Sequence, residues 1–155
     1  MVMLLFSNAA HTQPNKIKIN FHLRYEGQEI ELGSAYAFQE KYVQFENLRF
    51  YISDFRLCQG TESIAKMEKQ HCLIDAALPS SLKLNMEVEP AKKYDRIQFN
   101  LGIDSLTNVS GAMGGDLDPT KGMYWAWQSG YINFKLEGKT PSCPARNNLF
   151  QYHLG

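Results

Sequence analysis

The chain has no excess of charge of either sign. Its 16 Lys and Arg residues balance its 16 Asp and Glu residues, so the formal net charge is +0. Proteins that bind nucleic acid neutralise phosphates with clustered basic side chains, and this sequence holds no basic stripe. No apolar run approaches the roughly 20 residues that span a bilayer as a helix. We therefore exclude nucleic acid as a partner and expect no transmembrane segment.

The sequence also lacks the short motifs that mark common catalytic sites. It has no Gly-x-Ser-x-Gly elbow, no His-Glu-x-x-His motif and no phosphate-binding loop. Asp104 and Glu137 could form the paired carboxylates of a glycosidase, but any β-rich chain contains such pairs. We predict that this chain is not an enzyme.

Cysteine is scarce, with three residues in the chain. Cys58 ends one apolar run and Cys72 lies in the next. A hairpin between the two runs would make a Cys58–Cys72 disulfide geometrically plausible. Cys143 would then be left over, which is unusual for a secreted protein. The alternative is three unpaired thiols.

What the chain does have is strand-like alternation. At 155 residues and 44% hydrophobic content it suits one soluble domain. Apolar residues recur at every second position in Lys16–Tyr25, Leu82–Val88 and Arg96–Leu101, with Ile97, Phe99 and Leu101 expected to point inward. The aromatic-rich run Tyr42–Leu57 indicates two strands, or one strand with a bulge near Glu46 and Asn47. We predict an all-β fold, an antiparallel β-sandwich or a barrel-like sheet.

A long Gly- and Asp-rich loop, Gly102–Lys121, precedes the segment that carries both tryptophans. Loops of this length in a compact domain are usually functional or disordered. Trp125 and Trp127 would lie on one face of an extended strand, because successive side chains point to opposite faces. With Tyr124 and Tyr131 they would form an aromatic wall, either in the core or lining a site.

The two ends of the chain are unusual. Residues 1–6 are apolar and residues 7–10 are small, which resembles the tail of a secretory signal. We therefore expect residues 1–14 to be a signal remnant or a disordered terminus, and residues 15–155 to form a single domain. The last residues, 149–155, are apolar and aromatic, so we expect a fragment that lacks closing strands.

A dense set of short motifs runs from Phe99 to Gly138. It consists of FNLGIDS from Phe99, Asn108, SGA from Ser110, LDP from Leu117, GMYWAW from Gly122, SGY from Ser129 and FKLEG from Phe134. Weaker matches to the same pattern are YISDFRL from Tyr51, LID from Leu73 and FQYHLG from Phe150. Together these segments resemble a known family, the MbnP-like domain, in particular its Bacteroidetes branch of exported proteins.

The resemblance implies an exported, periplasmic or surface-exposed, β-sandwich-like protein that binds copper. It implies a di-haem cytochrome-peroxidase-like partner, and in some members a tryptophan oxidised to kynurenine that helps histidines to hold the metal. The family also typically continues past residue 155. The better-studied branch has four cysteines where this chain has three.

The residue chemistry gives candidates for such a site. Imidazole suits copper, whereas the indole nitrogen is a donor only and would need prior oxidation to bind metal. No two histidines are close in sequence, so a site has to be assembled across strands. The candidate metal residues are His22, His71, His153, Trp125 and Trp127.

Other interpretations remain open. Asp104, Asn108, Asp116 and Asp118 could offer oxygen ligands to calcium, although Asp118-Pro119 is also a good helix start. The tryptophan segment could instead be a stacking platform for carbohydrate or protein, or the core of a purely structural domain. Burial of the two indoles separates these alternatives.

Overall fold

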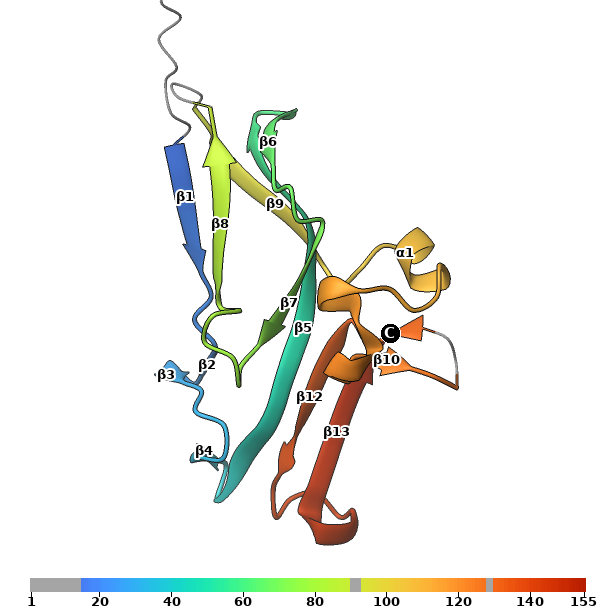
Figure 1. Cartoon of the computed structure of the whole chain (residues 1–155). Helices are drawn as coiled ribbons and strands as arrows, with labels where there is room; N and C mark the ends of the chain where they lie inside the picture. Colours follow the sequence, from blue (N-terminus) through green and yellow to red (C-terminus); the bar gives the residue numbers. More distant parts are fainter. Residues whose placement is uncertain (1–14, 90–92, 128–129) are drawn as a thin grey trace, which may run out of the picture.

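The computed structural model describes residues 15–89, 93–127 and 130–155. These residues form an all-β fold built around one very long strand, β5 (Lys41–Gln59), which runs the length of a curled sheet (Figure 1). The expected fold class is therefore confirmed. Among the described residues, no helix has the length and apolarity needed to cross a membrane. The predicted signal remnant, residues 1–14, lies outside the described residues.

Strand β5 is the centre of the sheet, because every neighbouring strand pairs with it in an antiparallel sense. One edge of β5 pairs with β12 (Phe134–Lys139) and β9 (Arg96–Leu101). The other edge pairs with β4 (Ala35–Phe38), β7 (His71–Asp75) and β6 (Glu62–Lys66). Beyond β12 lies β13 (Leu149–Leu154).

Irregularities in β5 keep its apolar side chains on one face. The pairing with β12 skips Glu46, and the pairing with β9 shifts between Ser53 and Arg56, where Asp54 has a φ of 51°. Each extra residue changes the phase of the alternation by one. The buried positions on this face are accordingly Val43, Phe45, Leu48, Phe50, Ile52, Phe55 and Leu57. The bulge predicted near Glu46 and Asn47 is thus confirmed.

A two-stranded ribbon covers this apolar face. It consists of β1 (Asn15–Asn20) and β8 (Lys83–Val88), whose Met86 and Val88 are buried against the β5 core. The alternation predicted for Leu82–Val88 is confirmed. A small hairpin of β2 (Arg24–Tyr25) and β3 (Gln28–Glu29) follows β1, so the predicted strand Lys16–Tyr25 is interrupted after Asn20.

The opposite face of the sheet is covered by the segment predicted to be a long loop (Figure 1). This segment holds α1 (Ser105–Val109) and the 3₁₀ turns η1 (Gly115–Leu117) and η2 (Pro119–Lys121). Asp104 caps α1 and Asp118 caps η2, with Pro119 at the first position, as the Asp-Pro pair suggested. A further turn, η3 (Arg146–Asn148), leads into β13.

Two local expectations were wrong. Ile97, Phe99 and Leu101 are 46–62% exposed, because β9 lies beside β5 where the described residues place no covering layer. The tryptophan segment is not one strand but a hairpin of β10 (Tyr124–Trp125) and β11 (Gly130–Tyr131), followed by β12.

The three cysteines are all free thiols. Cys58 lies opposite Ser63 on β6 and Arg96 on β9, whereas Cys72 lies opposite Ile52 on β5. The two residues therefore do not face each other across a hairpin, and the disulfide considered between them is not formed.

Candidate functional site

Buried hydrogen bonds hold residues 102–127 and 130–133 on the sheet as a cover. Tyr51 and Tyr131 are fully buried and meet edge to face at 6.1 Å. Tyr51 Oη donates to the carbonyl oxygen of Asp116 at 3.1 Å, and Tyr131 Oη donates to that of Leu117 at 2.9 Å. Burial raises the pKa of Tyr51 far above its usual value. Tyr51 therefore stays neutral, and the two hydroxyls donate the hydrogen bonds that hold the loop against the sheet.

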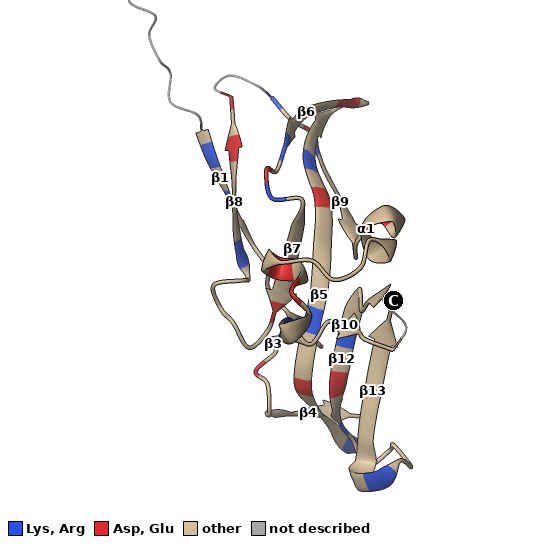
Figure 2. Ribbon diagram, turned by 45° about the vertical axis from the view of Figure 1, so that its right-hand side comes forward, with Lys and Arg blue, Asp and Glu red and all other residues tan. Residues whose placement is uncertain are grey.

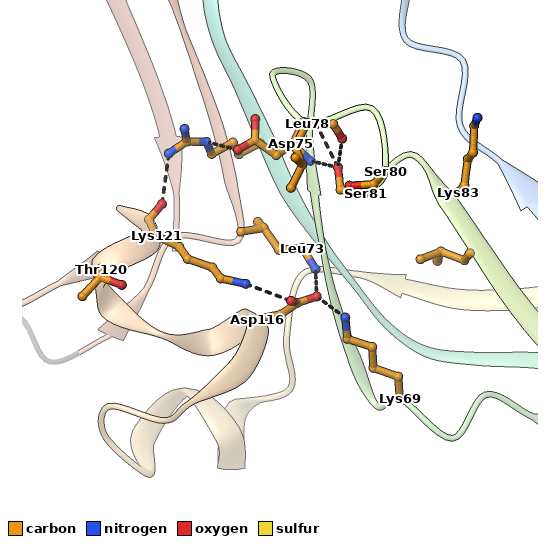
Figure 3. A pocket seen from close by; sticks show the side chains of 12 residues that line it. Lys69, Leu73, Asp75, Leu78, Ser80, Ser81, Lys83, Asp116, Thr120 and Lys121 are labelled. Atoms are coloured by element: carbon orange, nitrogen blue, oxygen red, sulfur yellow. Dashed lines mark hydrogen bonds and ion pairs between the residues drawn. The ribbon is translucent and has the colours of Figure 1, made fainter.

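Asp116 ties this cover to β7 with its carboxylate (Figure 3). It accepts from the backbone N–H of Leu73 at 2.8 Å and from Lys69 Nζ at 2.6 Å, and Lys121 Nζ lies 3.0 Å away. Burial alone would raise the pKa of Asp116. The bonds from Lys69, Leu73 and Lys121 outweigh burial and hold this pKa below its usual value.

A cavity of about 440 Å³ opens beside Asp116, between the loop and the sheet (Figure 3). Arg49 Nε lies 2.9 Å from Asp75 Oδ2, and Arg49 Nη1 donates to the carbonyl oxygen of Lys121 at 3.0 Å. Ser81 Oγ accepts from the backbone N–H of Asp75 at 2.9 Å. The charged residues lining the cavity are Arg49, Lys69, Lys83, Lys121, Asp75 and Asp116, so cations outnumber carboxylates.

A row of polar residues crosses the sheet from this cavity to its far edge. The strand register aligns Asp75 on β7, Arg49 on β5, Lys135 on β12 and His153 on β13. Figure 2 shows the alternation of basic and acidic positions along β5 and β12. Lys135 Nζ also donates to the carbonyl oxygen of Gly122 at 3.2 Å. The row thus links the sheet to the turn that precedes the tryptophans.

His153 has a carboxylate partner in this row. Its Nε2 lies 2.8 Å from Oε1 of Glu137, and Asn47 Nδ2 donates to Oε2 of the same carboxylate at 3.0 Å. Burial would raise the pKa of Glu137, but His153, Asn47 and the nearby Lys135 lower it below its usual value. Glu137 is therefore an anion that orients the imidazole through one nitrogen.

The two tryptophans lie at the hairpin beside the end of β13. Trp127 is 78% exposed, whereas Trp125 is half-buried and packs against the cluster that contains Met123 and Tyr131. Their ring centroids are 6.4 Å apart with the planes tilted by 44°. A Cβ on Gly155 would overlap the ring of Trp125. Trp125 therefore lies against the chain two residues beyond His153.

The predicted aromatic wall is only partly formed. Tyr124 and Tyr131 pair across the hairpin, with ring centroids 4.9 Å apart. Tyr131 is fully buried, so it belongs to the core and not to an exposed surface. An accessible indole remains at Trp127, next to a second indole that is anchored.

The three candidate histidines each contact a different carboxylate. His22 Nδ1 lies 3.0 Å from Glu29, His71 Nε2 lies 3.4 Å from Asp104, and His153 contacts Glu137. Within residues 15–89, 93–127 and 130–155, no group of three or more His, Cys, Asp or Glu residues is placed to hold a metal ion. Among the candidate metal residues, the structure brings Trp125 and Trp127 together. The imidazole of His153 contacts Glu137, and only the backbone two residues further along, at Gly155, lies against Trp125.

The acidic loop residues considered for calcium are occupied by local bonds. Asp104 accepts from the N–H and the hydroxyl of Thr107, and Asn108 Oδ1 accepts from the N–H of Tyr131. Asp118 caps η2, and Asp116 binds the two lysines. These contacts hold the Asp-rich loop in place and use oxygen atoms that a calcium ion would need.

Sequence reasoning missed Arg49, Asp75, Lys69 and Lys121 as members of one polar site. Arg49 and Asp75 come from neighbouring strands, and the two lysines come from segments far apart in the sequence. A cue was present in Arg49, a charged residue within a strand whose other positions are mostly apolar.

This all-β architecture, with the Trp-Ala-Trp hairpin placed over the sheet, can now be compared with known proteins. Residues 14–155 match the family described as MbnP. The chain belongs to the MbnP family. The resemblance noted in the sequence is therefore confirmed.

One solved structure supports the same fold. The chain is similar to MbnP from Methylosinus trichosporium, with a TM-score of 0.67 and 17% sequence identity over 93% of this chain. It covers 63% of that structure's own length. No curated protein has a matching sequence.

Proposed function

We propose that this chain is an exported copper-binding protein whose metal site lies at the corner between the tryptophan hairpin and the end of β13. Membership of the MbnP family supports a copper-associated role, as the sequence resemblance implies. The observation that carries the proposal is the 78% exposure of Trp127 beside the anchored ring of Trp125. Core packing does not account for an indole that is left this exposed.

The donor types at this corner fit copper. His153 supplies an imidazole, which suits copper, and Glu137 orients it. Neither indole can bind a metal through its protonated nitrogen. Oxidation of one ring to kynurenine would provide an aniline nitrogen and a carbonyl oxygen as additional donors. Bound copper would serve either as a redox centre or as a metal that the protein carries. The protein positions the imidazole and the modified ring.

The oxidation needs an external oxidant, and the accessible ring is the natural first target. A di-haem cytochrome-peroxidase-like partner, which the family resemblance implies, fits this requirement because it would act on Trp127 from outside. The chain would then serve as a substrate of its partner and as a metal carrier. We accordingly propose a binding function for this chain and not catalysis by it.

Mass spectrometry combined with metal analysis tests this proposal on protein purified from its native exported compartment. We expect bound copper and a peptide in which Trp125 or Trp127 has gained one oxygen and lost one carbon. His153→Gln should lower the copper content, whereas the matched control His22→Gln should leave it unchanged, because His22 lies with Glu29 at the β2–β3 hairpin. Unmodified tryptophans without metal would contradict the proposal.

The exposure of Trp127 also favours a second candidate, a stacking platform for carbohydrate. Aromatic rings at such sites pack against the apolar face of a ligand. This function would show oligosaccharide binding that Trp127→Ala abolishes and that chelators do not change. If Trp127→Ala retains copper but loses oligosaccharide binding, the result would favour the carbohydrate platform over the metal site.

A further inference from the structure

Three sulfur-bearing side chains gather inside the main core, on the face of the sheet away from the tryptophans. Cys72 and Met86 are each 2% exposed and Met67 is 6% exposed, and all three belong to one buried cluster. The Cys72 Sγ lies 3.8 Å from the Met67 Sδ and 4.0 Å from the carbonyl oxygen of Lys69. They come from β7, from the segment after β6 and from β8.

The separation of the two sulfurs suits a shared metal ion. Two sulfurs bonded to one ion at about 2.3 Å, the length typical of Zn–S bonds, with an angle of 110–120°, lie about 3.8–4.0 Å apart. Thiolate and thioether are soft ligands that suit Cu(I) and Zn(II), and a single thiolate balances the one positive charge of Cu(I). We propose that Cys72, Met67 and Met86 form a Cu(I)-binding site, distinct from the tryptophan and histidine corner.

Charge balance is compatible with burial. An isolated ion in an apolar core is strongly disfavoured. One thiolate neutralises one Cu(I), and the thioethers of Met67 and Met86 add no charge, so the complete site is neutral. Binding replaces the proton of the Cys72 thiol with the metal and releases that proton to water. No oxidant or reductant takes part, provided that copper arrives as Cu(I).

A cavity opens beside two of the three proposed ligands. Its volume is about 450 Å³, and Met67 and Met86 belong to its lining. Its polar lining consists of Lys16, Lys66, Glu68, Lys69, Asn85 and Glu87. Glu68 and Glu87 offer oxygen atoms that can hold a cation briefly on its way to the softer ligands. Without metal, the Cys72 thiol donates to the Met67 sulfur.

The test is an anaerobic titration of the full chain with Cu(I) against a chromogenic Cu(I) chelator. Met67→Leu and Met86→Leu conserve volume, so the fold should persist. Loss of outer-shell partners alone lowers metal affinity by roughly 10–100-fold, so loss of a direct ligand should lower it at least about tenfold. Cys72→Ser should abolish the site.

Matched controls separate ligation from damage to the core. Cys58→Ser removes another buried thiol, and Met123→Leu changes a fully buried methionine in the cluster on the opposite face. Both should retain the affinity that the chain has at this site without these substitutions. The titrations are also made on His153→Gln, which removes the imidazole of the proposed corner site and so separates the two sites. X-ray absorption of His153→Gln loaded with one equivalent of Cu(I) should show sulfur ligands alone. Equal losses in Cys58→Ser and Cys72→Ser, unchanged affinity in Cys72→Ser, or nitrogen ligands would overturn the proposal.

Discussion

The two faces of β5 are held together by different physical means. The face under the β1–β8 ribbon is apolar and is stabilised by burial of side chains such as Ile52 and Leu57. The face under the loop also contains buried rings, but charged groups such as Arg49 and Asp116 join its layers. The difference shows how one strand can support a rigid core on one side and a polar site on the other.

The largest expected effect is on the apolar face. Leu57 is fully buried, and Leu57→Ala should lower the free energy of unfolding by about 3 kcal/mol, within the range of roughly 2–5 kcal/mol for such truncations. Urea denaturation measures it. Leu106→Ala, at a position 76% exposed on α1, should change it by less than about 0.5 kcal/mol. Similar losses in both variants would contradict the assigned core.

A smaller loss is expected on the polar face. Asp116→Asn removes the charge that Lys69 and Lys121 contact, and should lower the free energy of unfolding by about 2 kcal/mol, since bonds to charged groups contribute roughly 1.5–3 kcal/mol. Asp118→Asn is the matched control, because Asp118 only caps a short exposed turn and should cost less than about 1 kcal/mol. The idea fails if the two variants lose the same amount.

Acid should weaken the polar face selectively. The pKa values of Asp116 and Glu137 are lower in the folded chain than their ordinary values, so the unfolded chain binds more protons at low pH. Their stabilisation is therefore complete above about pH 4–5 and is lost as pH falls through the folded pKa values. Thermal unfolding between pH 7 and pH 3 should show a smaller decrease for Asp116→Asn than for wild type. Leu57→Ala should keep the wild-type decrease.

The smallest effect on stability is expected at Trp127. Because this ring is 78% exposed, Trp127→Phe should change the free energy of unfolding by less than about 0.5 kcal/mol. Acrylamide should quench the fluorescence of Trp127 more strongly than that of the half-buried Trp125, and Trp127→Phe should remove the readily quenched component. Equal quenching of the single-tryptophan variants Trp125→Phe and Trp127→Phe would show that both indoles are equally accessible.

The sequence was sufficient to predict the fold class, because alternation in Leu82–Val88 and the aromatic run after Tyr42 are local signals. It also located the β5 bulge at Glu46. It misplaced Ile97, Phe99 and Leu101, since alternation shows which residues share a face but not whether a layer covers that face. It also placed both tryptophans on one extended strand, whereas β10 ends at Trp125, because aromatic residues favour strands up to and beyond a turn.

The candidate site was harder to predict than the fold. The tryptophan pair was visible in the sequence, but the partners of His153 and Asp116 depend on strand register and on the path of the loop. Arg49 aligns with Asp75 and Lys135 only once β7 and β12 lie beside β5. Contacts of this kind arise from tertiary structure and leave no local pattern.

The central position of β5 also determines the order in which this protein can fold. The hairpins that join β5 to β4 and β6 close over short loops and can form early. Phe50 meets Phe134 only after more than half of the chain has been synthesised and ordered, which makes that closure slow. Until then one edge of β5 is unpaired. This exposed edge makes the partly folded chain prone to aggregation, and a chaperone would protect it most at this stage.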